Sequence, residues 1–381
     1  MIRVVHLALF HAANDPRIVD KECRTLAGAG YDVHVVTGRA AATSTEGITF
    51  HSLNLPLAVS GIFQRFRGTV VGVFRAFSAA RRLQASVYHL HEVPLIPVGL
   101  WLRVFGHRVI YDAHEDAFRE KISHGITLGH PLVGWSFAIV ALVLEWLAKR
   151  MFNGFVAATP GIAARFPRGR TVVVHNFPRV EEYAQGDEFA GAGDYAERDN
   201  VAVYVGNLFR NRGAKEMIDA MSLVSVPCDA RLVIAGSFTP PALHEQLAAL
   251  AGWQRVEYLG WQSAAGVRRV LARARVGLAV LHPRPEYLTA YPVKLFEYMA
   301  AGLPVIVSDF PLWQRLVEDA HCGLAVDPLQ PRAIADALDT LFQDPARATE
   351  MGRRGRQAVC EKYNWDSEAA KLLDFYQQLC D

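Results

Sequence analysis

The sequence has few cysteines and no excess of charge of either sign. Its five cysteines are scattered over 381 residues without a Cys-x-x-Cys pair, which argues against a disulfide scaffold or a zinc ribbon and fits a reducing compartment. The formal net charge is only +2, so no global electrostatic bias points to nucleic acid. The first residues lack a secretory h-region followed by a cleavage site, so we expect a cytosolic protein.

The motifs that would decide several enzyme classes are also missing. The sequence has no Walker loop, nucleophile elbow, zinc signature or internal repeat. The loop expected at 11–17 has no Gly-x-Gly-x-x-Gly, which counts against a nicotinamide or flavin dinucleotide enzyme. The most apolar segment, 131–152, meets Glu145 before it reaches the roughly 20 apolar residues that a spanning helix needs. We therefore expect a buried or interfacial helix there.

The sequence does contain strands and helices in regular alternation. Short apolar, β-branched runs are followed by helical patterns, which is typical of parallel sheets with crossover helices. The chain is 51% hydrophobic, and its length suggests two domains. Residues 181–199 are acidic, rich in Gly and Ala and without periodicity, so they are the best linker. The expected division is a first domain over 1–180, this linker, and a second domain over 200–362.

Residues 282–309 show the clearest pattern for a ligand site. Prolines keep the start of this stretch in a loop, Pro292 suits the first position of a helix, and Gly302 follows the helix end. The free N–H groups and dipole of a helix N-terminus favour a phosphate. Glu297, just over a turn inside, can accept two hydrogen bonds from a ribose diol. The pattern predicts a nucleotide-diphosphate site, and the alternative is an amphipathic helix with a solvated Glu297.

Polar residues also follow two expected strands of the first half. Asp112, His114 and Glu115 leave the end of a strand expected at 109–111, and such groups are costly to bury but natural at a cleft. Asp112 and Glu115 can instead cap a helix. His89 and His91 share one face of another strand. A metal there would need further ligands that the sequence does not specify, and for His91 a ligand contact and a core position both stay open.

Residues 59–83 interleave arginines with apolar residues and contain no acidic residue. This pattern indicates one or two basic amphipathic helices, which can lie on an anionic membrane surface. The alternative is a helix packed on the core with solvated arginines.

The run Leu-Phe-Glu-Tyr-Met-Ala-Ala-Gly-Leu-Pro-Val-Ile-Val-Ser-Asp at 295–309 resembles the donor-binding segment of retaining glycosyltransferases of family 4, the glycosyltransferase group 1. The resemblance implies the α/β fold called GT-B, in which two Rossmann-like doubly wound domains face a cleft. It also implies that the last helix, here 363–381, packs back on the first domain. By resemblance, Glu297 binds the ribose and Lys294 takes over part of the phosphate binding. The family's second Glu falls on Thr289, with Glu286 displaced toward the N-terminus.

The resemblance extends to two further runs. The loop 206–213 is similar to the family's Gly-Arg-x-x-x-x-Lys-Gly, whose Lys is matched by Arg212, while its Arg falls on Asn207 with Arg210 nearby. In the run Tyr-Asp-Ala-His-Glu, His114 matches a family His that points at the donor sugar. The family's first loop lies over the catalytic cleft, and for its residues ordinary turn chemistry stays open. The acceptor or phosphate candidates are Asn14, Asp15, Arg17, His91 and Glu115.

The resemblance implies sugar transfer, with retention and without metal or other cofactor, from a UDP- or GDP-sugar to a saccharide or lipid-linked acceptor. We expect a role in surface or exopolysaccharide assembly, on the cytoplasmic face of the cell membrane. The catalytic candidates are His114, Arg212, Lys294 and Glu297. The donor-binding candidates are Gly206, Asn207, Arg210, Arg212, Gly236, Ser237, Trp261, Gln262, Glu286, Tyr287, Thr289, Pro292, Val293, Lys294, Leu295 and Glu297. The alternatives are a sugar-nucleotide epimerase of the same architecture and a non-catalytic scaffold of a polysaccharide-synthesis complex.

Overall fold

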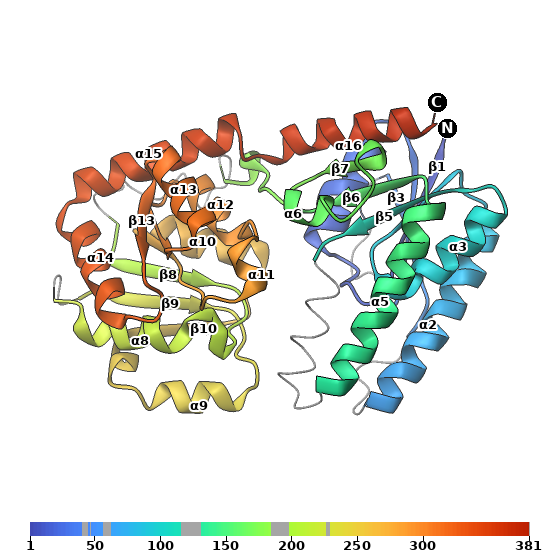
Figure 1. Cartoon of the computed structure of the whole chain (residues 1–381). Helices are drawn as coiled ribbons and strands as arrows, with labels where there is room; N and C mark the ends of the chain where they lie inside the picture. Colours follow the sequence, from blue (N-terminus) through green and yellow to red (C-terminus); the bar gives the residue numbers. More distant parts are fainter. Residues whose placement is uncertain are drawn as a thin grey trace. The chain divides into compact units, whose positions relative to one another are not determined.

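The computed structural model describes residues 1–39, 45, 47–55, 62–115, 131–183, 198–225 and 229–380. Within these residues the chain forms two compact units (Figure 1). The first contains Met1–Asn176 and Asp366–Asp381, and the second contains Phe177–Trp365. Most of the expected linker, 184–197, and the start of the basic segment, 59–61, lie outside the described residues.

A parallel sheet of seven strands forms the centre of the first unit. Its order is β3-β2-β1-β4-β5-β6-β7, and the direction of this order reverses between β1 and β4. Open α/β sheets bind ligands outside the carboxyl ends of their strands at such a switch point. The strands are β1 (Arg3–Ala8), β2 (Asp32–Thr37), β3 (Ile48–Ser52), β4 (Val87–Leu90), β5 (Arg108–Ala113), β6 (Gly154–Ala157) and β7 (Thr171–Val173).

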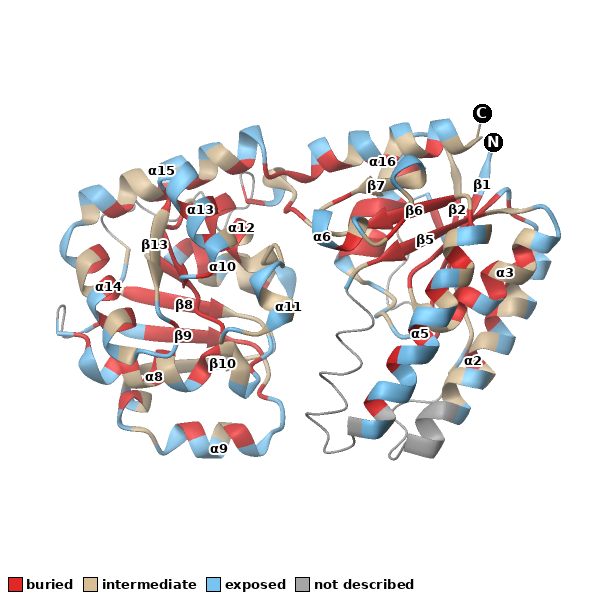
Figure 2. Cartoon of the chain, viewed as in Figure 1, coloured by how far each residue is buried: buried red, intermediate tan, exposed pale blue. Residues whose placement is uncertain are grey.

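Helices cover both faces of this sheet, so its strands are largely buried (Figure 2). Alternate residues of a strand point to opposite faces. Val5 and Tyr88 pack in one core with α2 (Ile62–Leu83), α3 (Ile96–Val104) and α5 (Pro131–Met151). The remaining helical elements are the π-helix η1 (Pro16–Cys23), α1 (Arg24–Gly28), η2 (Val93–Leu95), α6 (Pro160–Ala163), η3 (Arg168–Arg170) and α16 (Trp365–Cys380).

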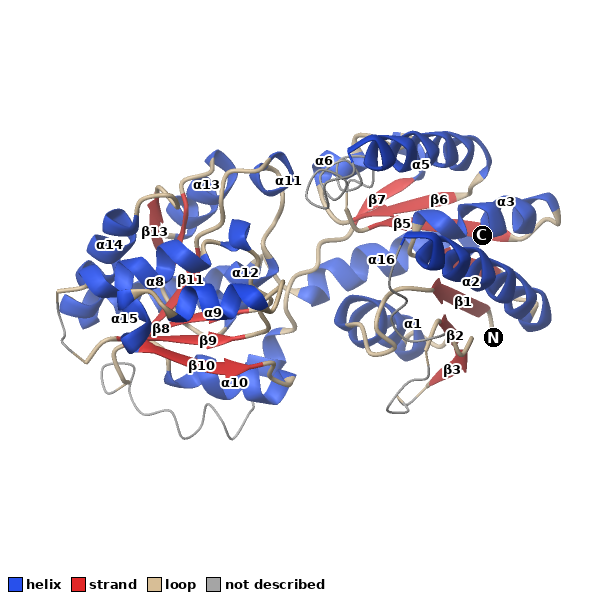
Figure 3. Ribbon diagram, turned by 90° about the horizontal axis from the view of Figure 1, so that it is seen from below, coloured by secondary structure: helices blue, strands red, loops and turns tan. Residues whose placement is uncertain are grey.

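The second unit repeats this plan with six parallel strands in the order β10-β9-β8-β11-β12-β13. Its switch point lies between β8 and β11, and helices again surround the sheet (Figure 3). The strands are β8 (Val201–Val205), β9 (Arg231–Ala235), β10 (Val256–Gly260), β11 (Val276–Ala279), β12 (Val305–Ser308) and β13 (Gly323–Val326). The helical elements are η4 (Val180–Tyr183), η6 (Arg210–Arg212), α8 (Ala214–Leu223), α9 (Ala242–Ala248), η7 (Ala251–Arg255), α10 (Ala264–Arg273), α11 (Pro285–Leu288), α12 (Val293–Ala300), α13 (Pro311–Ala320), α14 (Pro331–Gln343) and α15 (Pro345–Glu361).

The C-terminal helix α16 groups with the first unit although it follows the second in the chain. The hydroxyl of its Tyr376 lies 2.7 Å from Nδ1 of His89, and the ring of Phe375 fills the space beside Gly154. The first part of the first unit ends at Asn176, whereas the sequence predicts a boundary at 180. The difference arises because Phe177 packs on Phe296 in the core of the second unit.

None of the helices in the described ranges combines the length and the apolar character needed to cross a bilayer.

Candidate functional site

The switch point of the second unit is built around the glycine-bounded loop that follows β8. Gly206 has φ of +121°, and a Cβ on it would lie 2.6 Å from Nζ of Lys294, so a side chain here would displace the ammonium group. Gly213, with φ of +69°, is the N-cap of α8, and a Cβ there would collide with the carbonyl of Val280. The glycines therefore let the loop pass close to α12 and β11.

Two cations lie together in this loop region. Nζ of Lys294 donates to the hydroxyl of Tyr204 at 3.1 Å and lies 4.3 Å from the centre of its ring. The guanidinium of Arg212 lies 5.6 Å from the ring centre of Tyr287. Burial lowers the pKa of Lys294, and the charge of Arg212 lowers it further. Two partly buried cations in one place, one of which lowers the pKa of the other, favour an anion between them.

Of the neighbouring carboxylates, Glu297 acts to raise the pKa of Lys294, and two others are paired elsewhere. Glu216 of α8 lies 3.0 Å from His282, and Glu286 is paired with Arg284 at 2.7 Å. In the part of the chain that the structure describes, neither Lys294 nor Arg212 forms an ion pair with a carboxylate. The switch point is therefore electropositive, and the negative charge of a diphosphate suits it.

Helix α12 carries Lys294 and Glu297 on one side and packs its other sides into the core. The hydroxyl of Tyr298 accepts a hydrogen bond from the backbone N–H of Val205 at 3.0 Å, which fixes the helix to the end of β8. Glu297 is half-buried, while Leu295 and the residues around it are in the core. Lys294 and Glu297 are three residues apart and share a face, so the phosphate and ribose candidates follow one another along the helix.

Two predictions for this helix need correction. Pro292 caps α12 with φ of −75° and ψ of 113° and is not its first helical residue, while Val293 is. The side chain of Leu295 is fully buried, and its N–H donates to the carbonyl of Pro292 at 3.0 Å. Leu295 therefore supports the helix from the core and offers no free group to a donor.

The remaining donor candidates lie at carboxyl strand ends or in the loops beside them. The side-chain oxygen of Asn207 accepts from the N–H of Ser237 at 3.4 Å, which joins the ends of β8 and β9. Gly236, at the end of β9, stands against the carbonyl of Gly206 with no room for a side chain. Arg210, however, donates to Gln246 of α9 at 2.6 Å, so its guanidinium is already engaged within the loop region.

Trp261 and Gln262 follow β10. The Trp261 side chain is 73% exposed, and Gln262 donates to the carbonyl of Leu259 at 2.8 Å. Thr289 is exposed at the end of α11. The Tyr287 hydroxyl accepts from Asn211 at 3.3 Å. Sequence reasoning missed Tyr204, because its strand has the pattern of a buried core strand. Only its contact with Lys294 beside the loop shows that it belongs to the site.

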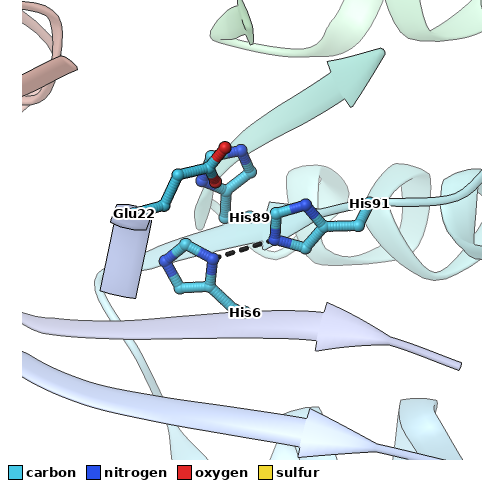
Figure 4. A group of neighbouring side chains, drawn as sticks. All are labelled: His6, Glu22, His89 and His91. Atoms are coloured by element: carbon cyan, nitrogen blue, oxygen red, sulfur yellow. Dashed lines mark hydrogen bonds between the residues drawn. The ribbon is translucent and has the colours of Figure 1, made fainter. Parts of the chain in front are cut away.

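The first unit gathers a second polar group at its own switch point. His6 and His89 are register partners in β1 and β4, and His91 follows β4. Figure 4 shows these three rings beside Glu22 of η1, with Nδ1 of His6 hydrogen-bonded to Nε2 of His91 at 2.9 Å. Ile110 of the adjoining β5 strand is the register partner of His89, and because a strand alternates its faces, Asp112 of β5 lies on the same side. His114 follows directly after β5. Sequence reasoning missed His6 and Glu22, since only the strand order brings them to His91.

Asp112 is the centre of this group. Its Oδ2 lies 2.9 Å from Nε2 of His114 and 3.4 Å from Nδ1 of His91, and its Oδ1 accepts from Arg17 at 3.2 Å. Burial works against the charged form, but Arg17 and then His114 outweigh it and hold the pKa of Asp112 well below its ordinary value. Burial lowers the pKa of His91 to about 4 against the opposing effect of Asp112, so His91 is neutral at physiological pH.

This placement corrects two of the acceptor predictions. Arg17 is buried and donates hydrogen bonds to Asp112 and to the carbonyl of Val174 at 2.9 Å, and its Nε lies 3.0 Å from a carboxyl oxygen of Glu22. His91 is buried too. Neither side chain is free to meet an acceptor, and both belong to the interior of the first unit.

The other three acceptor candidates remain nearer the surface. Asp15 accepts from the N–H groups of Arg17 and Ile18 and so caps η1. Asn14 and Glu115 are exposed. Glu92, which sequence reasoning missed, fixes the loop after β1, because its carboxylate accepts from the N–H groups of Leu9, Phe10 and His11.

Two family models match this chain. One, "Glycosyl transferase 4-like domain", matches residues 17–176, and the other, "Glycosyl transferases group 1", matches residues 199–344. The chain belongs to the group 1 glycosyl transferases. This confirms the resemblance found in the sequence, and the two parallel α/β units confirm the predicted fold class.

Relatives and solved structures agree with this assignment. The chain is 23% identical to a phosphatidyl-myo-inositol mannosyltransferase of Mycobacterium leprae over 301 residues, which cover 77% of this chain and 73% of the relative. Two further curated glycosyltransferases are matched over only about half of their length, 45% and 53%. The structure of a sucrose-phosphate synthase from Thermosynechococcus elongatus superimposes with a TM-score of 0.79 at 19% identity, over 100% of this chain and 99% of that one. Anabaena HepE, solved with UDP-glucose, gives 0.74 at 15% identity, over 99% and 100%.

Proposed function

We propose that this chain transfers a sugar from a nucleotide-diphosphate sugar to an acceptor hydroxyl. The observation that carries the proposal is the pair of cations, Lys294 and Arg212, at the switch point of the second unit without a carboxylate partner. A diphosphate bound there restores the charge balance and raises the lowered pKa of Lys294. Glu297, three residues further along α12, then accepts hydrogen bonds from the ribose. A nucleotide-sugar donor is also what HepE was solved with.

In the proposed reaction, the bond between the sugar and the diphosphate breaks while the acceptor oxygen attacks the same carbon from the same face. Lys294 and Arg212 stabilise the charge that develops on the leaving diphosphate, and this is their catalytic contribution. A phosphate oxygen of the leaving group takes the proton of the acceptor hydroxyl. Because attack and departure occur on the same face, the configuration at the sugar carbon is retained. By family resemblance, His114 contacts the hydroxyls of the transferred sugar.

The test is a thermal-shift panel with UDP, GDP and ADP, run on the wild type, Lys294→Met and Lys215→Met. Lys215 is the matched control, because it is an exposed lysine near the same loop that pairs with Asp219. A nucleotide at a hundred times its dissociation constant adds about 2.7 kcal/mol to the free energy of unfolding. We expect stabilisation by one base only, kept in Lys215→Met and lost in Lys294→Met. A flat panel, or equal stabilisation of all three proteins, would contradict the donor site.

A transfer assay then tests the chemistry. The donor chosen by the panel is incubated with saccharide or lipid-linked acceptors, and the anomeric configuration of the product is read by NMR. We expect a product with the configuration of the donor. An inverted product would refute the same-face step, and a nucleotide sugar converted to its epimer without acceptor would favour the epimerase.

The finer part of the proposal is that the acceptor is lipid-linked and that the first unit lies on an anionic membrane surface. Helix α5 supports this, because its fully buried residues among those described are small ones and Glu145, while many of its large apolar side chains are exposed. Its exposed large side chains are Leu132, Trp135, Phe137, Ile139, Val140, Leu142, Val143 and Trp146. Apolar surface of this extent marks an interaction site.

Helix α2 supplies the charge for such a surface. It carries exposed arginines, has no acidic residue, and its Phe74 is 70% exposed. Helix α3 packs against both α2 and α5, so the apolar and the basic helix belong to the same side of the sheet. Basic residues next to exposed aromatic and aliphatic side chains are what a monotopic helix needs to bind anionic lipid.

A further inference from the structure

The carboxylate of Asp112 lies at the centre of several hydrogen-bond donors. Its two oxygens accept from the guanidinium of Arg17 at 3.2 Å and 3.4 Å. Its Oδ2 also lies 2.9 Å from Nε2 of His114 and 3.4 Å from Nδ1 of His91. We propose that Asp112 is a positioning residue, which holds the imidazole of His114 with its proton on Nε2 so that Nδ1 accepts a hydrogen bond from a hydroxyl of the transferred sugar.

The short contact with Asp112 decides which nitrogen of His114 carries the proton. A charged carboxylate can only accept hydrogen bonds, so an unprotonated Nε2 would turn its lone pair toward a negative oxygen at 2.9 Å. A proton on Nε2 makes the same contact a charge-assisted hydrogen bond. The hydrogen bond of one ring nitrogen sets the state of the other, so Nδ1 keeps its lone pair.

The neighbouring histidine is compatible with this arrangement. Nδ1 of His91 lies 3.1 Å from Nε2 of His114, and Nε2 of His91 lies 2.9 Å from Nδ1 of His6. Burial lowers the pKa of His91 to about 4, so the ring is neutral and has one proton. That proton can lie on Nδ1, directed to Asp112, or on Nε2, directed to His6. In both cases the proton of His114 stays on Nε2.

Arg17 allows His114 to stay uncharged beside this carboxylate. The Arg17–Asp112 pair is buried and has no net charge. A carboxyl oxygen of the third ionisable group, Glu22, lies 3.0 Å from Nε of Arg17. Burial, and then the charge of Asp112, raise the pKa of Glu22 well above its ordinary value against the effect of Arg17, which favours the uncharged form of Glu22. The charge of Asp112 is therefore balanced by Arg17, and no second cation is needed at His114.

Nδ1 is the end of this network that can meet a ligand. Both hydrogen bonds of His114 within the described residues use Nε2, and the side chain is 17% exposed. Because the lone pair of Nδ1 can only accept, the contact requires a sugar hydroxyl that donates, whereas fluorine at the same position cannot donate. This step rests on the proposed function, which gives His114 to the transferred sugar.

The first measurement reads the position of the proton in the wild-type chain. Full-length protein is labelled with ¹⁵N-histidine, and NMR at neutral pH records the imidazole nitrogens. His114 is identified by the signal that is lost in His114→Gln. We expect a neutral ring with the proton on Nε2. A proton on Nδ1, or protons on both nitrogens, would overturn the proposal. This measurement uses neither donor nor transfer, and it decides the case even if a buried substitution prevents folding.

A second measurement compares Asp112→Asn with Asp32→Asn. The amide introduced by Asp112→Asn can donate to Nε2 of His114, so the proton is expected to move to Nδ1. Asp32 is the matched control, because it also lies between an arginine and a histidine, Arg3 at 2.7 Å and His34 at 3.1 Å, but at the start of β2. We expect the NMR signal of His114 to be unchanged in Asp32→Asn. A proton that stays on Nε2 in Asp112→Asn would contradict the role of Asp112.

Calorimetry then tests the contact with the sugar. UDP-glucose and GDP-mannose are the probes, each with fluorine in place of one sugar hydroxyl at a time, beside UDP and GDP alone. At one position, fluorine is expected to weaken wild-type binding about tenfold, as the loss of one hydrogen bond does. Asp112→Asn should lose this discrimination, keep the affinity for the nucleotide alone, and differ in the first respect from Asp32→Asn.

The outcomes separate this inference from the proposed function. Discrimination that is the same in Asp112→Asn and the wild type at every position would overturn the sugar contact, and so would an equal loss of affinity for nucleotide and nucleotide sugar. A wild type that binds no nucleotide would refute the proposed function and the sugar contact with it, whereas the position of the proton still tests what Asp112 does to His114.

Discussion

Removal of two tryptophans from α5 tests whether its outer face binds a membrane. Trp135 and Trp146 are 48% and 50% exposed, and a fully buried aromatic side chain covers about 150–250 Å², so each presents roughly 100 Å². At about 25 cal/mol per Å² of apolar surface removed from water, each contributes at most about 2.5 kcal/mol to insertion. Tryptophan often stays at the headgroup level, so we expect a total loss of about 2–4 kcal/mol in the variant Trp135→Ser with Trp146→Ser.

That loss corresponds to a fall of roughly 30-fold to 1,000-fold in the partition coefficient. It is measured by sedimentation with liposomes that contain anionic lipid. Trp261→Ser is the control, because Trp261 is 73% exposed to solvent, more than either replaced tryptophan, but belongs to the second unit. The two replaced tryptophans lie on the surface, so thermal stability is expected to stay within about 0.5 kcal/mol of the wild type.

Two results would refute the reasoning about this face. Unchanged sedimentation of the double variant would mean that α5 is covered by something other than lipid. Equal partitioning of the wild type to neutral and anionic liposomes would remove the role of the α2 arginines, each of which is expected to add about 1 kcal/mol near an anionic surface.

Three further outcomes follow from the contacts described above. Glu297→Gln should abolish the preference for a ribonucleoside diphosphate over its 2′-deoxy analogue. In the wild type, calorimetry should show a preference of about 10-fold to 100-fold, because hydrogen bonds to a charged group contribute about 1.5–3 kcal/mol. Equal preference in both proteins would remove Glu297 from the ribose site. Gly206→Ala should weaken diphosphate binding more than it lowers the urea midpoint, because its Cβ would stand 2.6 Å from Nζ of Lys294, and an unchanged dissociation constant would contradict this. Burial opposes the charged form of Glu368, but hydrogen bonds from His175 and Lys371 outweigh burial and lower the pKa of Glu368. The charged carboxylate therefore stabilises the fold above its ordinary pKa of 4.5, and this stabilisation is lost as pH falls through the lowered value. The destabilisation by Glu368→Gln, measured by urea unfolding, should be full at pH 7 and shrink below about pH 4, and a penalty independent of pH would contradict the assignment.

The fold could be predicted because its signals are local. Proline and glycine mark the ends of α12, and the helix that the sequence predicts from 293 to 301 is observed at Val293–Ala300. The β-branched run after it forms β12. The error at Pro292 is equally local, since a proline suits the cap of a helix as well as its first residue. Hydrogen bonds within a few residues decide such features, and the sequence contains all of them.

The polar group of the first unit could not be predicted, because its members come from distant parts of the chain. His6, Glu22 and Asp112 meet only when β1, β4 and β5 are neighbours in that order. Arg17 shows the consequence. A basic residue in a loop after a strand suggests a ligand contact. However, β5 brings the buried carboxylate of Asp112 to within 3.2 Å of Arg17, and the arginine is then needed to neutralise that charge. The sequence shows which groups are present but not which of them neutralise one another.

Helix α5 shows what hydropathy alone leaves undecided. A run this apolar predicts a buried or interfacial helix, and the two differ in which side chains face the protein. Gly134, Ala138, Ala141 and Ala148 recur at spacings of three, four and seven residues and form the buried side, where small residues let the backbone approach its neighbours. Eight large side chains of this helix are exposed and contribute little to the core. The fold does not require them, so their presence argues for a partner outside the chain, and the arginines of α2 on the same side of the sheet favour an anionic lipid surface as that partner.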